Sequence, residues 1–223
     1  MNDIGIGIMC FGTEKYFEHT QMLIETLEGI DTYILTDNPV IFSETQKTIK
    51  YDRAVKSYHD KIILVKEILK FHDICIILDA DALIKDITVI NDLITHQFQE
   101  GITYIDYLRS ASYNTIGDIH PTERWNSYFS YIKNIYPDYI HLETIHEYFI
   151  VFKRNIKYDF FVEYEKLQIT KEYCDVKCGK EILGAGEGVS IQIAAKITNT
   201  PIRKDIKLNS MIQNKILNIT QEK

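Results

Sequence analysis

Apolar and polar positions along the chain change their spacing from one segment to the next. Strand-like segments, among them five consecutive apolar residues at 74–78, alternate with segments whose apolar residues recur at helical spacing. The predicted strands lie at 4–11, 31–37, 47–52, 74–78 and 147–153. The predicted helices lie at 16–27, 59–72, 89–98, 155–167 and 189–197. Strands that alternate with helices in this way predict an α/β fold, with a mostly parallel central sheet flanked by helices.

The size and composition of the chain suit one ordinary domain. It has 223 residues and a mass of 26.1 kDa. Hydrophobic residues make up 45% of it, so it can form a sizeable core. No linker, internal repeat or low-complexity tract divides it. We therefore expect a single domain over 1–223.

The charge pattern narrows the range of partners. The formal charge is −7, and the Lys and Arg residues are scattered instead of forming a stripe. Such a surface cannot neutralise a phosphate backbone, so we expect no nucleic acid as a partner. The apolar runs are shorter than the roughly 20 residues that cross a bilayer, and Asp3 stands where a secretory signal would have basic residues. These features predict no transmembrane segment and a cytoplasmic location, in the host cell if the protein is viral.

Two aspartates directly follow the apolar run 74–78, in the sequence Asp79-Ala80-Asp81. Carboxylates two residues apart at a strand end can converge on one hard divalent cation and leave its other positions for phosphate oxygens and water. The carboxyl edge of a parallel sheet is also where α/β proteins bind ligands. Acidic pairs in loops are often only solvated, but this context predicts a metal and phosphate site.

The sequence around this pair resembles the glycosyltransferases of the GT-A fold, above all the glycogenin and blood-group types. In that family a basic residue opens a helix and the next strand ends in the two aspartates, as Lys61 and the run 71–84 do here. The segment CFGTEKY at 10–16 matches the nucleotide-binding first strand and turn of the family. Thr36-Asp37 matches the end of its second strand.

The resemblance implies a donor site built from several strand ends. The residues implied are Phe11, Gly12 and Tyr16 for the base, Thr36 and Asp37 for the base or ribose, and Lys61, Asp79, Ala80 and Asp81 for the rest of the donor and its metal. Mn²⁺ or Mg²⁺ held by Asp79 and Asp81 would act as a Lewis acid on the departing diphosphate. The family often adds a C-terminal His as a metal ligand, but no His follows His146 here.

A second carboxylate is expected near the reacting sugar carbon, as a base, a nucleophile or a stabiliser of positive charge. Glu187 is the candidate, because it follows a glycine-rich turn at a helix start, where such transferases often carry an acidic residue. On the acceptor side, Trp125 would stack on a sugar and Glu147 would orient hydroxyl groups. The resemblance thus divides the domain into a nucleotide-sugar-binding half at 1–90 and an acceptor half at 100–205.

The expected function is metal-dependent transfer of a hexose from a nucleoside-diphosphate sugar, with UDP as the expected nucleotide, to a hydroxyl group of a glycan or another acceptor. Three alternatives stay open. A phosphohydrolase of the haloacid dehalogenase type also has an apolar strand ending in Asp-x-Asp, but at its start. A nucleotide-binding module without catalysis would not need Glu187. A nucleotidyltransferase commonly has a glycine-rich basic loop, which CFGTEKYF lacks. Without the family, Phe11 and Tyr16 equally suit core packing.

Overall fold

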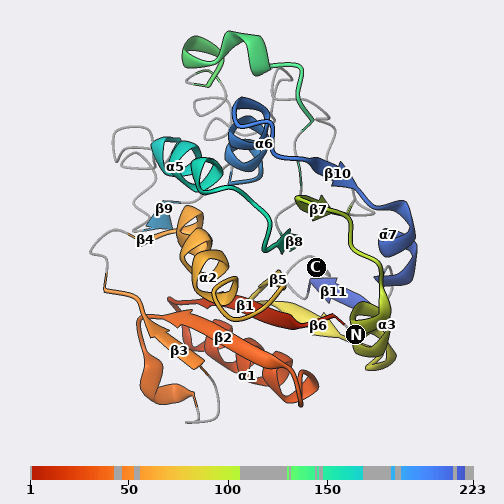
Figure 1. Cartoon of the computed structure of the whole chain (residues 1–223). Coiled ribbons are helices and arrows are strands. Elements are labelled where there is room, and N and C mark those ends of the chain that lie inside the picture. The colour runs from red at the N-terminus through yellow and green to blue at the C-terminus, as the bar shows by residue number, and fades with distance from the viewer. Residues whose placement is uncertain are drawn as a thin grey trace.

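A seven-stranded sheet lies at the centre of the described part of the chain (Figure 1). The computed structural model describes residues 2–42, 47–52, 56–105, 130, 132–143, 145, 148–167, 182–183, 187–212 and 215–218. The strands of the sheet are β1 (Ile4–Cys10), β2 (Asp31–Thr36), β3 (Lys47–Lys50), β5 (Ile74–Asp79), β7 (Ile102–Tyr104), β8 (Phe149–Lys153) and β10 (Ile202–Lys204). Their spatial order is β10-β7-β8-β5-β1-β2-β3. Only the two pairs that involve β8 are antiparallel, so the predicted mostly parallel sheet is confirmed.

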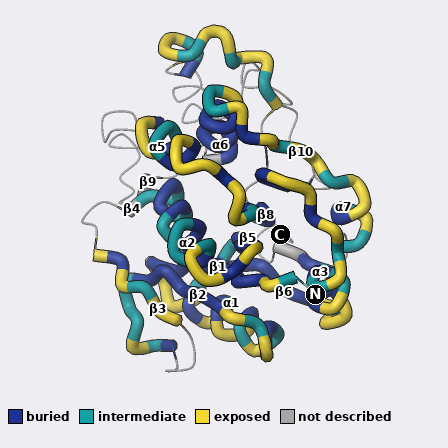
Figure 2. Tube along the Cα trace, in the orientation of Figure 1, coloured by how far each residue is buried: buried dark blue, intermediate teal, exposed yellow. Residues whose placement is uncertain are grey.

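Helices cover both faces of this sheet (Figure 1). One layer contains α2 (Lys61–Ile68), α5 (Tyr158–Lys166) and α6 (Glu187–Ile197), and the other contains α1 (Glu14–Thr26), α3 (Thr88–Thr95) and α7 (Ile206–Ile212). Figure 2 shows β1, β2 and β5 as buried, as expected for strands covered on both faces. Within the described ranges, no helix is both long enough and apolar enough to cross a bilayer.

The composition of β1 explains how closely α2 lies on the sheet. Ile8 belongs to the apolar cluster on the α1 face, whereas Gly7 lies under α2. A Cβ atom added at Gly7 would come within 2.7 Å of Ile77 Cδ1 and 3.2 Å of Leu64 Cβ. Because β1 has no side chain there, α2 packs directly on the strand. A helix that connects parallel strands runs opposite to them, so α2 begins at the carboxyl edge of the sheet.

Most predicted elements differ from the structure by a few residues at their ends, and the largest change is in the helix predicted at 59–72. The predicted helix 59–72 is divided into a 3₁₀ turn, η2 (Tyr58–Asp60), and α2, which ends at Ile68. Beyond β5 the chain leaves the central sheet, and β6 (Ala82–Ile84) pairs antiparallel with β11 (Ile216–Asn218). The remaining short elements are β4 (Lys56–Ser57), which pairs with β9 (Ile182–Leu183), and the 3₁₀ turns η1 (Pro39–Ile41) and η3 (Pro137–Tyr139).

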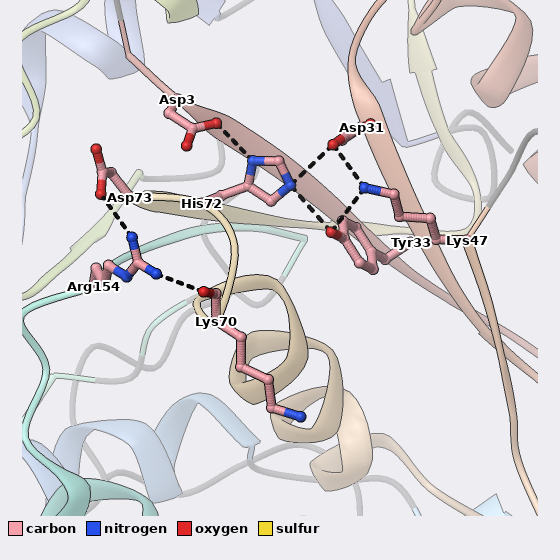
Figure 3. Close-up of polar contacts among 8 residues, drawn as sticks. All are labelled: Asp3, Asp31, Tyr33, Lys47, Lys70, His72, Asp73 and Arg154. Carbon is pink, nitrogen blue, oxygen red and sulfur yellow. Dashed lines mark hydrogen bonds and ion pairs between the residues drawn. The ribbon is translucent and has the colours of Figure 1, made fainter.

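A polar network joins the strands at the opposite, amino edge of the sheet (Figure 3). The buried His72 ring lies 2.7 Å from Asp3 Oδ1 through Nδ1 and 3.1 Å from the Tyr33 hydroxyl through Nε2. Lys47 donates hydrogen bonds to Asp31 at 2.7 Å and to Tyr33 at 3.1 Å. These contacts connect the starts of β1, β2 and β3 to the segment after α2. His72, which the sequence places at the end of the predicted helix, thus follows α2 and contacts the edge of the sheet.

Candidate functional site

The ends of β1 and β5 lie side by side at the carboxyl edge of the sheet. Met9 in β1 is the register partner of Asp79 in β5, so Phe11 and Asp81 leave the sheet at neighbouring positions. The chain builds β2 and β3 on one side of β1 and then places β5 on its other side. Such a switch point is where open α/β sheets bind ligands. The predicted metal-binding pair therefore lies at the position where a ligand site is expected.

The two aspartates differ in their surroundings. Asp81 is only 6% exposed, and Ala80 beside it is also buried. The Asp79 side chain is 27% exposed and accepts a hydrogen bond from Lys61 Nζ at 2.6 Å. Lys61 is the first residue of α2, and its side chain is 11% exposed, so solvent and salt screen this ion pair less than a surface pair. The site thus combines two carboxylates and one ammonium group.

Tyr16, in the first turn of α1, lies within electrostatic reach of both carboxylates. Burial raises the pKa of its hydroxyl, and the negative charges of Asp81 and Asp79 raise this pKa further. The hydroxyl therefore stays protonated at neutral pH and can donate a hydrogen bond. Gly12, in the turn between β1 and α1, is exposed on this side of the site.

Phe11 is packed between two tyrosine rings. Its ring centroid is 5.8 Å from that of Tyr51 and 5.6 Å from that of Tyr58, and both pairs are stacked. Phe11 and Tyr51 are buried, whereas Tyr58 is only partly buried. The ring of Phe11 therefore belongs to the core, and contact between this ring and a base stays a prediction. Tyr58 is the member of the column with the most access to solvent.

A buried carboxylate fixes the turn that carries Tyr58 and Lys61. Asp60 is fully buried and accepts a hydrogen bond from the Tyr51 hydroxyl at 2.5 Å. The oxygen of that hydroxyl also accepts a hydrogen bond from the Ser57 amide at 2.9 Å. Sequence reasoning missed this arrangement. The available signal was an acidic residue directly before the lysine that opens the helix.

The end of β2 contributes two residues with different surroundings. Thr36 is fully buried, and its hydroxyl oxygen accepts a hydrogen bond from the Asn38 amide at 3.1 Å. This contact stabilises the turn before Pro39. Asp37 is partly buried, and its charge contributes to raising the pKa of Cys10, so it lies near the end of β1. Asp37 is therefore the better placed of the two to contact a ligand at this edge.

Cys10 gives a test of the packing at the end of β1. Burial raises the pKa of its thiol from 9.0 to about 11. The folded state thus holds the proton more firmly, and the resulting stabilisation is complete below pH 9.0 and lost as the pH rises toward about 11. We expect iodoacetamide to leave Cys10 unmodified in the folded protein at neutral pH and to modify it in urea. Peptide mass spectrometry measures both, and rapid modification of folded protein would contradict this packing.

Three of the predicted site residues have no described side-chain environment. Trp125 and Glu147 lie outside the described residues. Glu187 is the first residue of α6, as the glycine-rich turn before it predicted, but the structure does not describe the position of its side chain. The helix that it opens belongs to the same layer as α2, which Lys61 opens. The roles of these three residues remain predictions.

The donor atoms at this edge suit a hard divalent cation. Asp79 and Asp81 offer carboxylate oxygens, which Mg²⁺ and Mn²⁺ prefer as ligands. Among the residues that the structure describes, no group of three or more His, Cys, Asp and Glu side chains could hold a metal ion. Two carboxylates leave most coordination positions to phosphate oxygens and water. The residues present therefore fit a cation that binds together with a nucleotide.

Comparison with known proteins finds similarity in structure. No family model and no curated protein matches the chain. Galactosyltransferase LgtC, with donor and acceptor sugar analogues, is 11% identical over 85% of this chain and 69% of its own, with a TM-score of 0.49. The catalytic domain of Drosophila β1,4-galactosyltransferase 7 with xylobiose is 12% identical over 96% of this chain and 70% of its own, with a TM-score of 0.46. 4-Diphosphocytidyl-2C-methyl-D-erythritol synthase from Anaerococcus prevotii is 10% identical over 95% of this chain and 96% of its own, with a TM-score of 0.48. Sugar transferases of the kind that the sequence resembles are thus among the structural neighbours, and likeness at this level assigns no activity.

Proposed function

We propose that the protein is a metal-dependent glycosyltransferase. It would move a hexose from a UDP-sugar to a hydroxyl group of a glycan or another acceptor. The observation that carries the proposal is the position of Asp79, Asp81 and the Lys61 ammonium group at the switch point between β1 and β5. Two carboxylates and an ammonium group match the needs of a diphosphate that binds with a divalent cation.

The residues at this edge have complementary roles toward the donor. Asp79 and Asp81 would hold Mn²⁺ or Mg²⁺, which supplies Lewis-acid stabilisation of the departing diphosphate. Lys61 adds positive charge at the same place. The protonated Tyr16 hydroxyl is available to donate a hydrogen bond to a phosphate or ribose oxygen. Together these groups bind the diphosphate and orient the bond between sugar and phosphate.

We assign the base and ribose to the ends of β1 and β2. Because the Phe11 ring is buried, its backbone, exposed Gly12 and the Tyr58 ring are the surfaces available to a base. Asp37 can accept a hydrogen bond from the base or from a ribose hydroxyl. Thr36 holds the turn that carries Asp37, so its contribution is one of position.

The acceptor side of the proposal comes from the sequence alone. Glu187 is assigned to the reacting carbon, and Trp125 and Glu147 are assigned to the acceptor. The nucleotide-sugar-binding half at 1–90 and the acceptor half at 100–205 belong to this same proposal. The cytoplasmic location and the exclusion of nucleic acid as a partner stay predictions from composition and charge.

A thermal-shift experiment tests the proposed donor site without an acceptor. UDP, GDP, CDP, UDP-glucose and UDP-galactose are each added with Mn²⁺ or with EDTA, because a ligand that binds only the folded state raises Tm. We expect the uridine ligands to raise Tm only with Mn²⁺. No shift with any nucleotide, together with hydrolysis of p-nitrophenyl phosphate, would favour the phosphohydrolase instead. A shift without transfer from any donor to any acceptor would favour the binding module.

A further inference from the structure

The ion pair between Lys61 and Asp79 occupies one of the two carboxylates that the proposed metal requires. Lys61 Nζ lies 2.6 Å from Asp79 Oδ1, and the two side chains are 11% and 27% exposed. A divalent cation on the same carboxylate would lie close to the lysine ammonium, with little water between the two positive charges. Repulsion between like charges is strong where water is largely excluded. The pair therefore opposes binding of the metal alone.

Lys61 can change its partner without movement of the helix. Its backbone is fixed because the preceding turn is held by the hydrogen bonds of Tyr51 to Asp60 and Ser57. The Lys61 ammonium also lies 5.7 Å from the centroid of the Tyr58 ring. The four-carbon side chain of a lysine rotates freely compared with the planar group of arginine. The ammonium can thus turn from Asp79 to a phosphate oxygen at the same edge of the sheet.

We propose that Lys61 couples the binding of the metal to the binding of the diphosphate, an inference that rests on the proposed function. Without a diphosphate, Lys61 stays paired with Asp79 and disfavours the cation on that carboxylate. A diphosphate gives the ammonium new oxygen partners, and Asp79 is released to the cation. Because binding free energies are linked, each ligand then raises the affinity for the other by the same factor. The site selects a metal–diphosphate complex over either component.

The coupling is tested by measuring Mn²⁺ affinity with and without saturating UDP, from the electron paramagnetic resonance signal of free Mn²⁺, after subtraction of the Mn²⁺ that the same UDP concentration binds without protein. The variant is Lys61→Met, which keeps an unbranched side chain one atom shorter than that of lysine and removes its charge. The matched control is Lys66→Met. Lys66 lies on the same helix and pairs with Glu165, away from Asp79, and this substitution removes the same charge as Lys61→Met does. Lys61→Met should bind Mn²⁺ alone about tenfold more tightly than wild type, and UDP should raise its Mn²⁺ affinity about tenfold less. Lys66→Met should behave as wild type in both measurements.

The possible results separate this inference from the proposed function. If Lys61→Met and wild type have the same Mn²⁺ affinity and the same response to UDP, the inference is overturned and the donor site stands. If wild type binds no Mn²⁺ even with UDP, the proposed function is overturned and the inference with it. Lys61→Arg is the second variant if Lys61→Met does not fold. It keeps the positive charge beside Asp79, so it should bind Mn²⁺ alone as weakly as wild type, and tight binding would overturn the inference.

Discussion

Asp81→Asn is expected to lower metal-dependent sugar transfer by about a hundredfold or more while the protein stays folded. Asp81 is 6% exposed at the end of β5, beside the end of β1. Asparagine has nearly the same shape, so it preserves the packing of the turn. It lacks the negative charge that would hold the cation, and the departing diphosphate would lose its main stabilisation. The loss should therefore fall on catalysis and on metal-dependent donor binding.

The experiment compares donor turnover with Mn²⁺ in wild type, Asp81→Asn and a matched control. Asp92→Asn is the control, because Asp92 lies on α3 and pairs with Lys215 at 2.8 Å, in contacts unrelated to the site. The control should keep wild-type activity, and circular dichroism should show all three proteins folded. Wild-type turnover by Asp81→Asn would remove this residue from the site.

Gly101→Ala is expected to lower the free energy of unfolding by roughly 2–5 kcal/mol, the sum of a left-handed backbone penalty and overpacking. Gly101 directly precedes β7 and has a φ of +86°. A Cβ atom there would lie 2.0 Å from the carbonyl oxygen of Pro201. That oxygen accepts a hydrogen bond from the Ile102 amide at 2.8 Å. The clash is thus with backbone that joins β10 to β7, and neither strand can move without loss of pairing.

Gly29→Ala is the matched control for this prediction. Gly29 has a φ of +83°, close to that of Gly101, but a Cβ atom added there meets nothing within 4 Å. It should therefore cost only the left-handed penalty, about 1–2 kcal/mol. Urea denaturation of both variants gives the two free energies of unfolding. Equal losses would show that the contact with Pro201 does not determine the cost at Gly101.

The central strands could be predicted because local pattern and tertiary position agree in them. β1, β2 and β5 are covered on both faces, and their sequences, IGIGIMC, DTYILT and ICIILD, are mostly apolar or β-branched. β7 and β10 have three residues each and were not predicted. Their strand structure depends on tertiary pairing: β10 pairs with β7, and β7 also pairs with β8. No local sequence pattern indicates these pairings.

The candidate site was predictable where its residues follow strand ends directly. Asp79 and Asp81 follow a strong apolar run, and Lys61 opens a helix, so sequence order alone brings them to one edge. The burial of Phe11 between Tyr51 and Tyr58 arises from residues about 40 positions apart and has no local signal. The 3₁₀ turn at Tyr58–Asp60 likewise has no local signal, because the Asp60 carboxylate in it accepts a hydrogen bond from Tyr51, which lies outside the predicted helix.

Diffraction at the manganese absorption edge, from crystals grown with UDP and Mn²⁺, tests the central claim most directly. The account predicts an anomalous peak within coordination distance of the Asp79 and Asp81 carboxylates, with the diphosphate of UDP on the same ion and the base at the ends of β1 and β2. Manganese and UDP bound elsewhere on the molecule, with both aspartates making only protein contacts, would contradict it.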